Sequence, residues 1–166
     1  RLFLSQYMIP KPGEMVDIEG HVLGEHKGIE FFTIGQRRGL GLAAGTPLYV
    51  VGLEPETRRV IVGPEEALYS LTLQASGVTW TSGSPPTGPV EVAVKIRYKS
   101  HEALATLIPR GECAELRFQE PQRAITPGQA VVFYQGQEVI GGGFIREAVA
   151  SRSMDPHLVL AGASTQ

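Results

Sequence analysis

The sequence predicts an all-β protein in which a small central β domain is followed by a C-terminal β-barrel. The chain has 166 residues with 20 Gly and 12 Pro, a composition rich in turns. Its apolar residues fall in short runs between these turn formers, which favours small sheets and barrels. The clearest run, residues 90–99, alternates apolar and polar residues as a half-buried strand does.

The first half of the chain is expected to form the central domain, over residues 12–72. Residues 1–11 are expected to be a linker or the end of a helix, because prolines prevent a helix from continuing. Two hairpins follow, each with short apolar runs around a turn, at residues 15–23 and 48–62. Because the chain starts without an initiator Met, we expect it to be a piece of a longer protein.

The barrel is expected over residues 73–150, with a loose tail at 151–166. Alternation in its clearest strand places Val94 and Ile96 inward and Lys95 outward. Short strands at regular spacing favour a closed barrel. The further strands are expected at 102–108, 113–118, 130–135 and 137–141.

Composition limits the kinds of function. The formal net charge of −2 gives no overall attraction to nucleic acid, so an RNA site must be a local patch. No run is long and apolar enough to cross a bilayer, and no membrane partner is expected. The single cysteine, Cys113, excludes an internal disulfide and a cysteine-based zinc site, and fits a reducing, cytosol-like compartment. We expect Cys113 to be a small buried strand residue.

No catalytic or metal site is expected in this chain. The four histidines lack metal-ligand spacing. His26 beside Glu25 is expected to form a surface ion pair. The sequence contains no Gly-x-Ser-x-Gly elbow and no His-Glu-x-x-His motif.

Residues 33–41, which we name the Gly-Arg loop, set Gln36, Arg37 and Arg38 among three glycines. Glycines at this density permit positive φ and indicate a shaped loop. Guanidinium groups suit phosphate or carboxylate. The spacing is that of neither a dinucleotide-binding loop nor a P-loop. Both an anion-facing loop and an ordinary solvated turn fit this pattern.

Basic residues on the strand at 90–99 are a second candidate site. Lys95, Arg97 and Lys99 alternate on one face, next to Tyr98. Cations that contact phosphates and rings that stack on bases suit RNA. The same residues also fit a solvated strand face with Tyr98 in the core.

The amino-acid sequences of several segments resemble those of one protein family. The Gly-Arg loop is followed by Lys-Ile-Arg-Tyr at 95–98, Pro-Gln-Arg-Ala-Ile-Thr-Pro-Gly-Gln at 121–129 and three glycines at 141–143. Together they resemble the central domain and C-terminal barrel of bacterial tRNA-specific 2-thiouridylases, over residues 1–146. An older name of this family is tRNA (5-methylaminomethyl-2-thiouridylate)-methyltransferase.

The resemblance implies an ATP-dependent sulfur transfer, in the cytoplasm, to the wobble uridine (U34) of Lys, Glu and Gln tRNAs. It implies that a sulfur-carrier protein supplies persulfide sulfur. ATP with Mg, a Ser-Gly-Gly-x-Asp-Ser loop and the catalytic cysteines would belong to a missing N-terminal domain. This sequence contains no such loop, and Cys113 matches neither cysteine. The chain alone is expected to bind no cofactor and to be inactive, with that N-terminal domain among its partners.

Carried over residue by residue, the resemblance implies tRNA contacts at Arg97, Tyr98 and Gln129. Since Arg97 and Tyr98 are adjacent, both can touch RNA only at a strand end or a bulge. A tRNA or interdomain contact by the polar residues of the Gly-Arg loop is our own inference.

Two readings compete with the RNA-binding one. The barrel could be a small protein-interaction module without an RNA role, or the chain could be an unrelated enzyme that uses Ser or His. Binding of tRNA measured against duplex DNA separates the first from RNA recognition, and a turnover assay tests the second.

Overall fold

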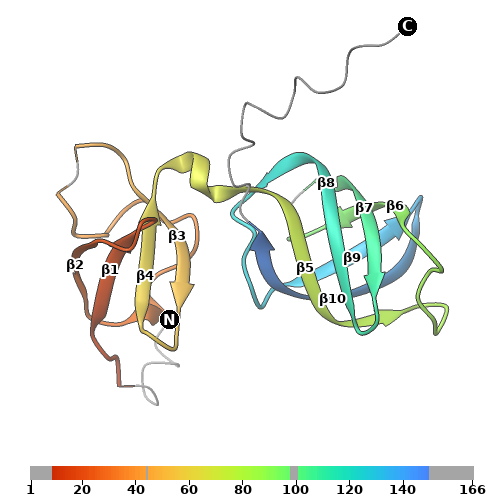
Figure 1. The fold of residues 1–166 in the computed structure, drawn as a ribbon, viewed down its shortest axis with the longest axis horizontal. Coiled ribbons are helices and arrows are strands. Elements are labelled where there is room, and N and C mark those ends of the chain that lie inside the picture. Colours follow the sequence, from red (N-terminus) through yellow and green to blue (C-terminus); the bar gives the residue numbers. More distant parts are fainter. Residues whose placement is uncertain (1–8, 44, 98–100, 150–166) are drawn as a thin grey trace, which may run out of the picture.

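The computed structural model of the chain describes residues 9–43, 45–97 and 101–149. In these ranges it contains ten β-strands and two short 3-10 turns, arranged as a four-stranded sheet and a closed six-stranded barrel (Figure 1). The predicted all-β class is confirmed. No helix in the described part of the chain could cross a membrane. The segment expected before residue 9 and the tail at 151–166 lie outside the described residues.

The first sheet contains both hairpins that the sequence predicts. Its strand order is β2-β1-β4-β3, and β1 pairs with β4 in parallel while the other neighbours are antiparallel. The strands are β1 (Gly13–Asp17), β2 (Val22–His26), β3 (Tyr49–Glu54) and β4 (Arg59–Gly63). On one side, β1 therefore pairs with a strand that lies more than forty residues further along the chain.

The connection between β2 and β3, residues 27–48, covers the core of this sheet. It begins with the 3-10 turn η1 (Ile29–Phe31) and includes the Gly-Arg loop. The buried sheet residues are Met15, Val50, Val60 and Val62, and the connection packs Ile29, Phe32, Ile34, Leu40, Leu42 and Leu48 against them. The loop is therefore held by apolar side chains near both of its ends.

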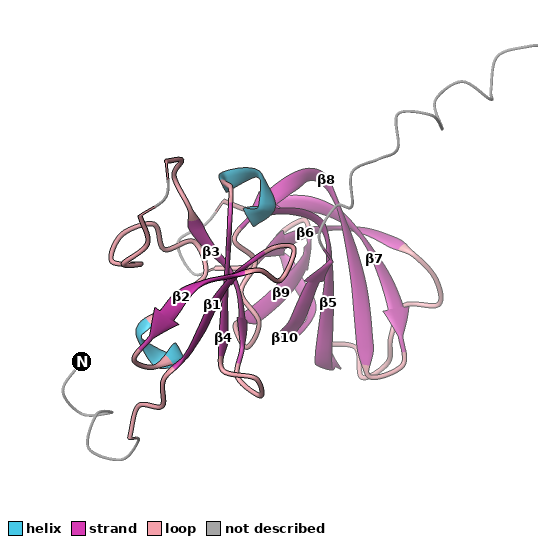
Figure 2. Ribbon diagram, turned by 60° about the vertical axis from the view of Figure 1, so that its left-hand side comes forward, coloured by secondary structure: helices cyan, strands magenta, loops and turns pink. Residues whose placement is uncertain are grey.

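The second unit is a barrel with strand order β10-β5-β8-β7-β6-β9, closed by pairing of β10 with β5 and with β9. The 3-10 turn η2 (Glu65–Leu68) leads into it (Figure 2). Its strands are β5 (Tyr69–Trp80), β6 (Val90–Lys95), β7 (Ala103–Arg110), β8 (Cys113–Arg123), β9 (Ala130–Gln135) and β10 (Glu138–Val149). Strand β5 begins at Tyr69, earlier than the boundary at residue 72 placed from the sequence.

Strand β6 follows the predicted alternation. Val94 is fully buried and Ile96 is buried just beyond the strand end, while Lys95 points outward and is half-buried. Burial of every second side chain inside a closed barrel fixes the strand register, because a slip of one residue would turn Lys95 inward.

Strand β10 is longer than expected, since the sequence analysis ended it at residue 141. It continues through Gly142 and Gly143 to Val149. A Cβ on Gly141 would lie 2.6 Å from the carbonyl oxygen of Thr79, and one on Gly142 would lie 2.8 Å from that of Val131. Glycine here allows β10 to approach both neighbouring strands closely, so the glycine run belongs inside the strand.

His26 is buried, so the prediction of a surface ion pair with Glu25 is wrong. Its Nδ1 accepts the backbone N–H of Gly28 (3.1 Å), and its Nε2 lies 3.0 Å from the carbonyl oxygen of Arg58. The ring also meets Phe32 edge-on, with centroids 5.3 Å apart. One acceptor and one donor nitrogen describe a neutral imidazole with the proton on Nε2. The residue ties the connection to the turn before β4.

Cys113 is the first residue of β8 and pairs with Arg110. It is half-buried and has a free thiol, so the expected strand position is correct but full burial is not. A position at a strand end beside a turn leaves one side of the thiol open.

Replacing His26 by Leu should cost roughly 1–3 kcal/mol of unfolding free energy, because the Gly28 N–H and the Arg58 carbonyl both lose a buried partner. Urea unfolding measures the change. The matched control is His101→Leu, an exposed position at which we expect less than about 0.5 kcal/mol. Equal effects of the two changes would contradict a bridging role for His26.

Candidate nucleic-acid interface

The Gly-Arg loop has a defined shape that its own hydrogen bonds fix. The Gln36 side chain accepts the backbone N–H of Thr33 (3.1 Å) and donates to the carbonyl of Arg38 (2.9 Å). The loop also exchanges two backbone hydrogen bonds with Val50 of β3, at 2.8 Å each. Gln36 is therefore a structural residue of the loop, and its amide is committed to backbone groups.

Arg37 and Arg38 lie on the outer part of this loop and are exposed. Gly35 and Gly39 beside them have φ of 89° and 75°, which other residues rarely adopt, so the glycines give the loop its turn. Within the described part of the chain, neither guanidinium has a hydrogen bond or an ion pair. Arg37 lines a hollow of about 240 Å³. Two exposed guanidinium groups on a fixed loop suit an anionic ligand.

Residues 124–129 belong to the segment 121–129 that carries part of the resemblance, and they form a loop between β8 and β9 that Arg97 braces. The Nη2 atom of Arg97 donates to the carbonyl oxygens of Arg123 (2.8 Å) and Ala124. Thr126 Oγ1 donates to the same Ala124 oxygen (3.1 Å). Residues 124–129 are called the 124–129 loop below.

Gln129 closes the 124–129 loop and enters β9. Its N–H bonds to the carbonyl of Thr126 (3.4 Å), and its own carbonyl accepts the N–H of Ile145 on β10 (2.8 Å). The residue is exposed. Backbone ties on both sides present the Gln129 side chain from a rigid base.

Of the residues of the second candidate site, Lys95, at the end of β6, and Arg97, two positions further on, are described. Of the two, only Arg97 is a predicted tRNA contact. It is exposed and lies in the bend after the strand ends at Lys95, as a contact residue next to Tyr98 requires. Tyr98 and Lys99 lie outside the described residues. The sequence analysis treated Arg97 as a phosphate donor and missed that its guanidinium also binds two backbone oxygens of the neighbouring loop.

The two loops meet where the sheet and the barrel join. A Cβ on Gly35 would lie 3.5 Å from Cβ of Ala124 and 3.7 Å from Nη1 of Arg123. The Arg123 guanidinium sits 5.8 Å from the ring centroid of Tyr49 and forms an ion pair with Glu65 (3.4 Å). Arg123 thus contacts β3, η2 and the Gly-Arg loop.

The sequence analysis named none of these junction residues as a site. Arg123 lies within the segment 121–129, which the resemblance singled out. Tyr49 opens the segment Tyr-Val-Val at 49–51, which also resembles the family, whereas Glu65 lies in no such segment. They are recognised only once the fold brings them to Arg123.

A separate hollow of about 570 Å³ beside the junction is acidic. It is lined by Glu65, Glu66, Tyr69, Glu120 and Pro121. Carboxylates repel phosphate, so an RNA backbone is not expected to enter it.

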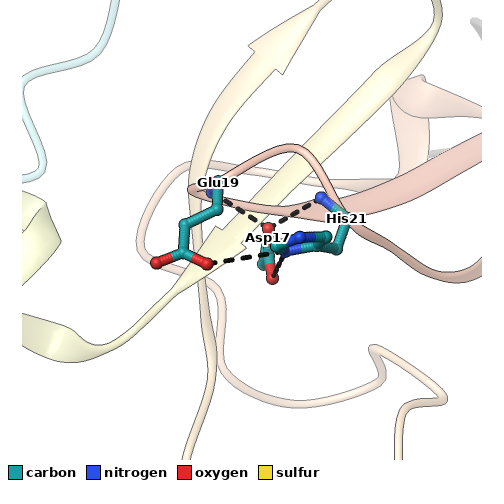
Figure 3. Close-up of side chains that lie close together, drawn as sticks. All are labelled: Asp17, Glu19 and His21. Carbon is teal, nitrogen blue, oxygen red and sulfur yellow. Dashed lines mark hydrogen bonds and ion pairs between the residues drawn. The ribbon is translucent and has the colours of Figure 1, made fainter.

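The turn between β1 and β2 brings Asp17, Glu19 and His21 together (Figure 3). The Asp17 carboxylate accepts the backbone N–H groups of Glu19 (2.9 Å) and His21 (2.8 Å), and lies 3.0 Å from Nδ1 of His21. The backbone hydrogen bond from His21 is the largest cause that lowers the pKa of Asp17 below its ordinary value. These contacts close the turn, and the cluster is explained as a hairpin cap.

Because the pKa of Asp17 is lowered on folding, its contribution to stability is present above the pKa of the unfolded chain. That contribution is lost as pH falls through the lower, folded value. We expect the carboxyl ¹³C shift of Asp17 to titrate at lower pH in the folded chain than in a peptide of residues 14–24. The same midpoint in both would contradict the capping role.

Two family models match the chain. Residues 1–64 match a tRNA methyl transferase PRC-barrel domain, and residues 70–145 match an aminomethyltransferase β-barrel domain. These ranges coincide with the sheet unit and the barrel unit of the structure. The chain therefore joins two β domains, one similar to a domain of tRNA methyl transferases and one similar to the barrel of aminomethyltransferases.

Curated relatives identify the family. The chain is 47% identical over 150 residues to a tRNA-specific 2-thiouridylase MnmA of Chlorobium luteolum, covering 87% of this chain and 40% of that protein. For the relatives of the same name from Halothermothrix orenii and Magnetococcus marinus, identity is 49% and 52%, over 82% and 81% of this chain and 38% of each protein. The chain belongs to the tRNA-specific 2-thiouridylase family, and the sequence-based resemblance is confirmed. It spans about two fifths of the length of these relatives.

Proposed function

We propose that this chain is the tRNA-holding part of an ATP-dependent tRNA 2-thiouridylase that makes 2-thiouridine at U34 of Lys, Glu and Gln tRNAs. The observation that carries the proposal is the meeting of two polar loops at one junction, with Gly35 against Ala124. Both loops belong to segments that the family resemblance singles out. The relatives are tRNA-specific 2-thiouridylases, and they suggest tRNA as the substrate class.

The chemistry is assigned to parts of the enzyme outside this chain. Adenylation needs a nucleotide-binding loop for ATP and Mg, and sulfur transfer needs a persulfide-forming cysteine. The chain has one cysteine, at the start of a barrel strand, and no Ser-Gly-Gly-x-Asp-Ser loop. We infer that this chain alone is inactive. The catalytic domain and a sulfur-carrier protein would be its partners, and the cytoplasm its compartment.

The proposed contacts divide by chemistry. Arg37 and Arg38 supply phosphate donors, and Gln129 supplies an uncharged amide for a base or ribose edge. Arg97 positions the 124–129 loop through its carbonyl bonds and presents its charge at the same place. A stacking role for Tyr98 stays a prediction, to be tested by comparing Tyr98→Ala with Tyr98→Phe.

The direct test is binding of the 166-residue chain to a Glu tRNA, with duplex DNA of similar charge as the control. Preference for the tRNA at every salt concentration supports the proposal. A second candidate, a protein-interaction module, is favoured by the acidic hollow that Glu65, Glu66 and Glu120 line. Equal, weak binding to both nucleic acids would favour that candidate.

If Arg37 and Arg38 each neutralise one phosphate, each Ala substitution should reduce the salt slope of log K by about 1. Affinity measured between low and physiological salt gives the slope. The matched control is Arg110→Ala, an exposed Arg at the end of β7, 3.8 Å from Glu115. An unchanged slope for both loop variants would exclude the Gly-Arg loop from the interface.

The bracing of Gln129 by Arg97 predicts coupled effects. Gln129→Ala should weaken tRNA binding without changing the salt slope, because the amide is uncharged. In an Arg97→Ala background the same change should have a much smaller effect, since the loop has lost its brace. The measurement is a double-mutant cycle of tRNA affinities, with melting curves to verify folding. Strict additivity would show that Arg97 and Gln129 act independently.

A further inference from the structure

An aromatic side chain stands exposed beside the 124–129 loop. Phe144 on β10 is 58% exposed, although Phe is among the residues most often buried. Strand pairing places it across from Ala130 on β9, the residue after Gln129, and across from Ser76 on β5. Both neighbours are small, and neither can cover the ring.

A bulge in β5 sets the position of this ring. The register between β10 and β5 shifts between Gly142 and Phe144, opposite Gly77. Gly77 has φ of 58°, and a Cβ built there would lie 3.9 Å from Cδ2 of Phe144. Bulges at barrel surfaces re-aim side chains. The ring therefore rests beside bare backbone on one side and is open to solvent elsewhere.

The groups around the ring match the parts of a nucleotide. Arg146 follows the buried Ile145 and is exposed, at a second shift of the register between β10 and β5 that lies between Ile145 and Glu147. Glu147 beside it is exposed as well. Gln129 lies at the adjacent end of β9, joined to Ile145 by a backbone hydrogen bond of 2.8 Å. A ring can stack on a base, a guanidinium can bind phosphate, and an amide can bind a base edge.

We propose that Phe144 is a stacking plate for one unpaired base of the bound tRNA, with Gln129 at the edge of that nucleotide and Arg146 at a phosphate. This inference rests on the proposed function. It adds that the nucleotide bound by the barrel is unpaired. Stacking requires an open base face, so the ligand is a loop, bulge or end of the RNA and not a duplex.

The chain provides a matched control for exposure alone. Leu104 on β7 is also 58% exposed, and it pairs with Ala93 of β6. In the closed barrel, β6 and β9 separate its strand from β10. Leu104 lines a hollow with polar residues, among them His101 and Gln119, but it lies on a different strand from Phe144. Single exposed apolar residues are common on protein surfaces, so Leu104 shows what exposure alone contributes to binding elsewhere on the barrel.

The experiment measures binding of the whole chain to tRNA, to a short single-stranded RNA and to duplex RNA. Phe144→Ala should weaken binding to tRNA and to the single strand by roughly 5- to 150-fold, with the salt slope unchanged and duplex binding intact. Phe144→Trp should retain binding, and Leu104→Ala should change it by less than about twofold. Melting curves verify that each exposed-site variant folds.

Wild-type affinity in Phe144→Ala overturns the stacking role, and so does full recovery in Phe144→Leu, because an aliphatic side chain fills space without stacking. An equal loss in Leu104→Ala also overturns it. These outcomes leave the proposed function standing as long as wild-type chain prefers tRNA over duplex DNA. If the wild-type chain shows no such preference, the proposed function fails and this inference fails with it.

Discussion

The backbone of Ala124 is the constraint on which the arrangement of both loops depends. Ala124 has φ of 51°, a left-handed conformation that costs a residue with a Cβ about 1 kcal/mol or more. Such a conformation persists only where its surroundings hold it. Here the N–H of Ala124 bonds to Leu68 (2.8 Å), and its carbonyl receives Arg97 and Thr126. The bond to Leu68 ties the barrel loop to the segment that leaves the sheet.

Acidic and basic side chains are unevenly distributed around the junction of the two units. The chain carries 17 acidic and 15 basic side chains, so its long-range field does not attract RNA. At the junction, however, Glu65 is partly neutralised by Arg123, while Arg37 and Arg38 face solvent without an acidic partner among the described residues. This local separation of the two signs is the reason for proposing that a polyanion binds at the loops and not at the acidic hollow.

Local patterns predicted the parts of the fold that depend on neighbours in sequence. The hairpins follow from turn residues between apolar runs, and the burial of Val94 and Ile96 follows from alternation. Side-chain contacts whose partner is distant along the chain were not predicted from the sequence. His26 reads as a surface residue until Arg58 is seen beside it, and the carbonyls bound by Arg97 lie 26 and 27 positions away. No periodicity encodes such contacts.

The pairing of distant strands also has a consequence for how the chain acquires its structure. In the sheet β1 pairs with β4, and in the barrel β5 pairs with β10. The first strand of each unit therefore gains one of its neighbours only when one of the last strands has been made. Contacts of such long sequence separation slow folding, because the chain must close large loops before they form. During synthesis, β5 emerges from the ribosome well before β10. Its inward side chains stay exposed to water until β10 closes the barrel, which makes this interval the period of greatest risk of aggregation.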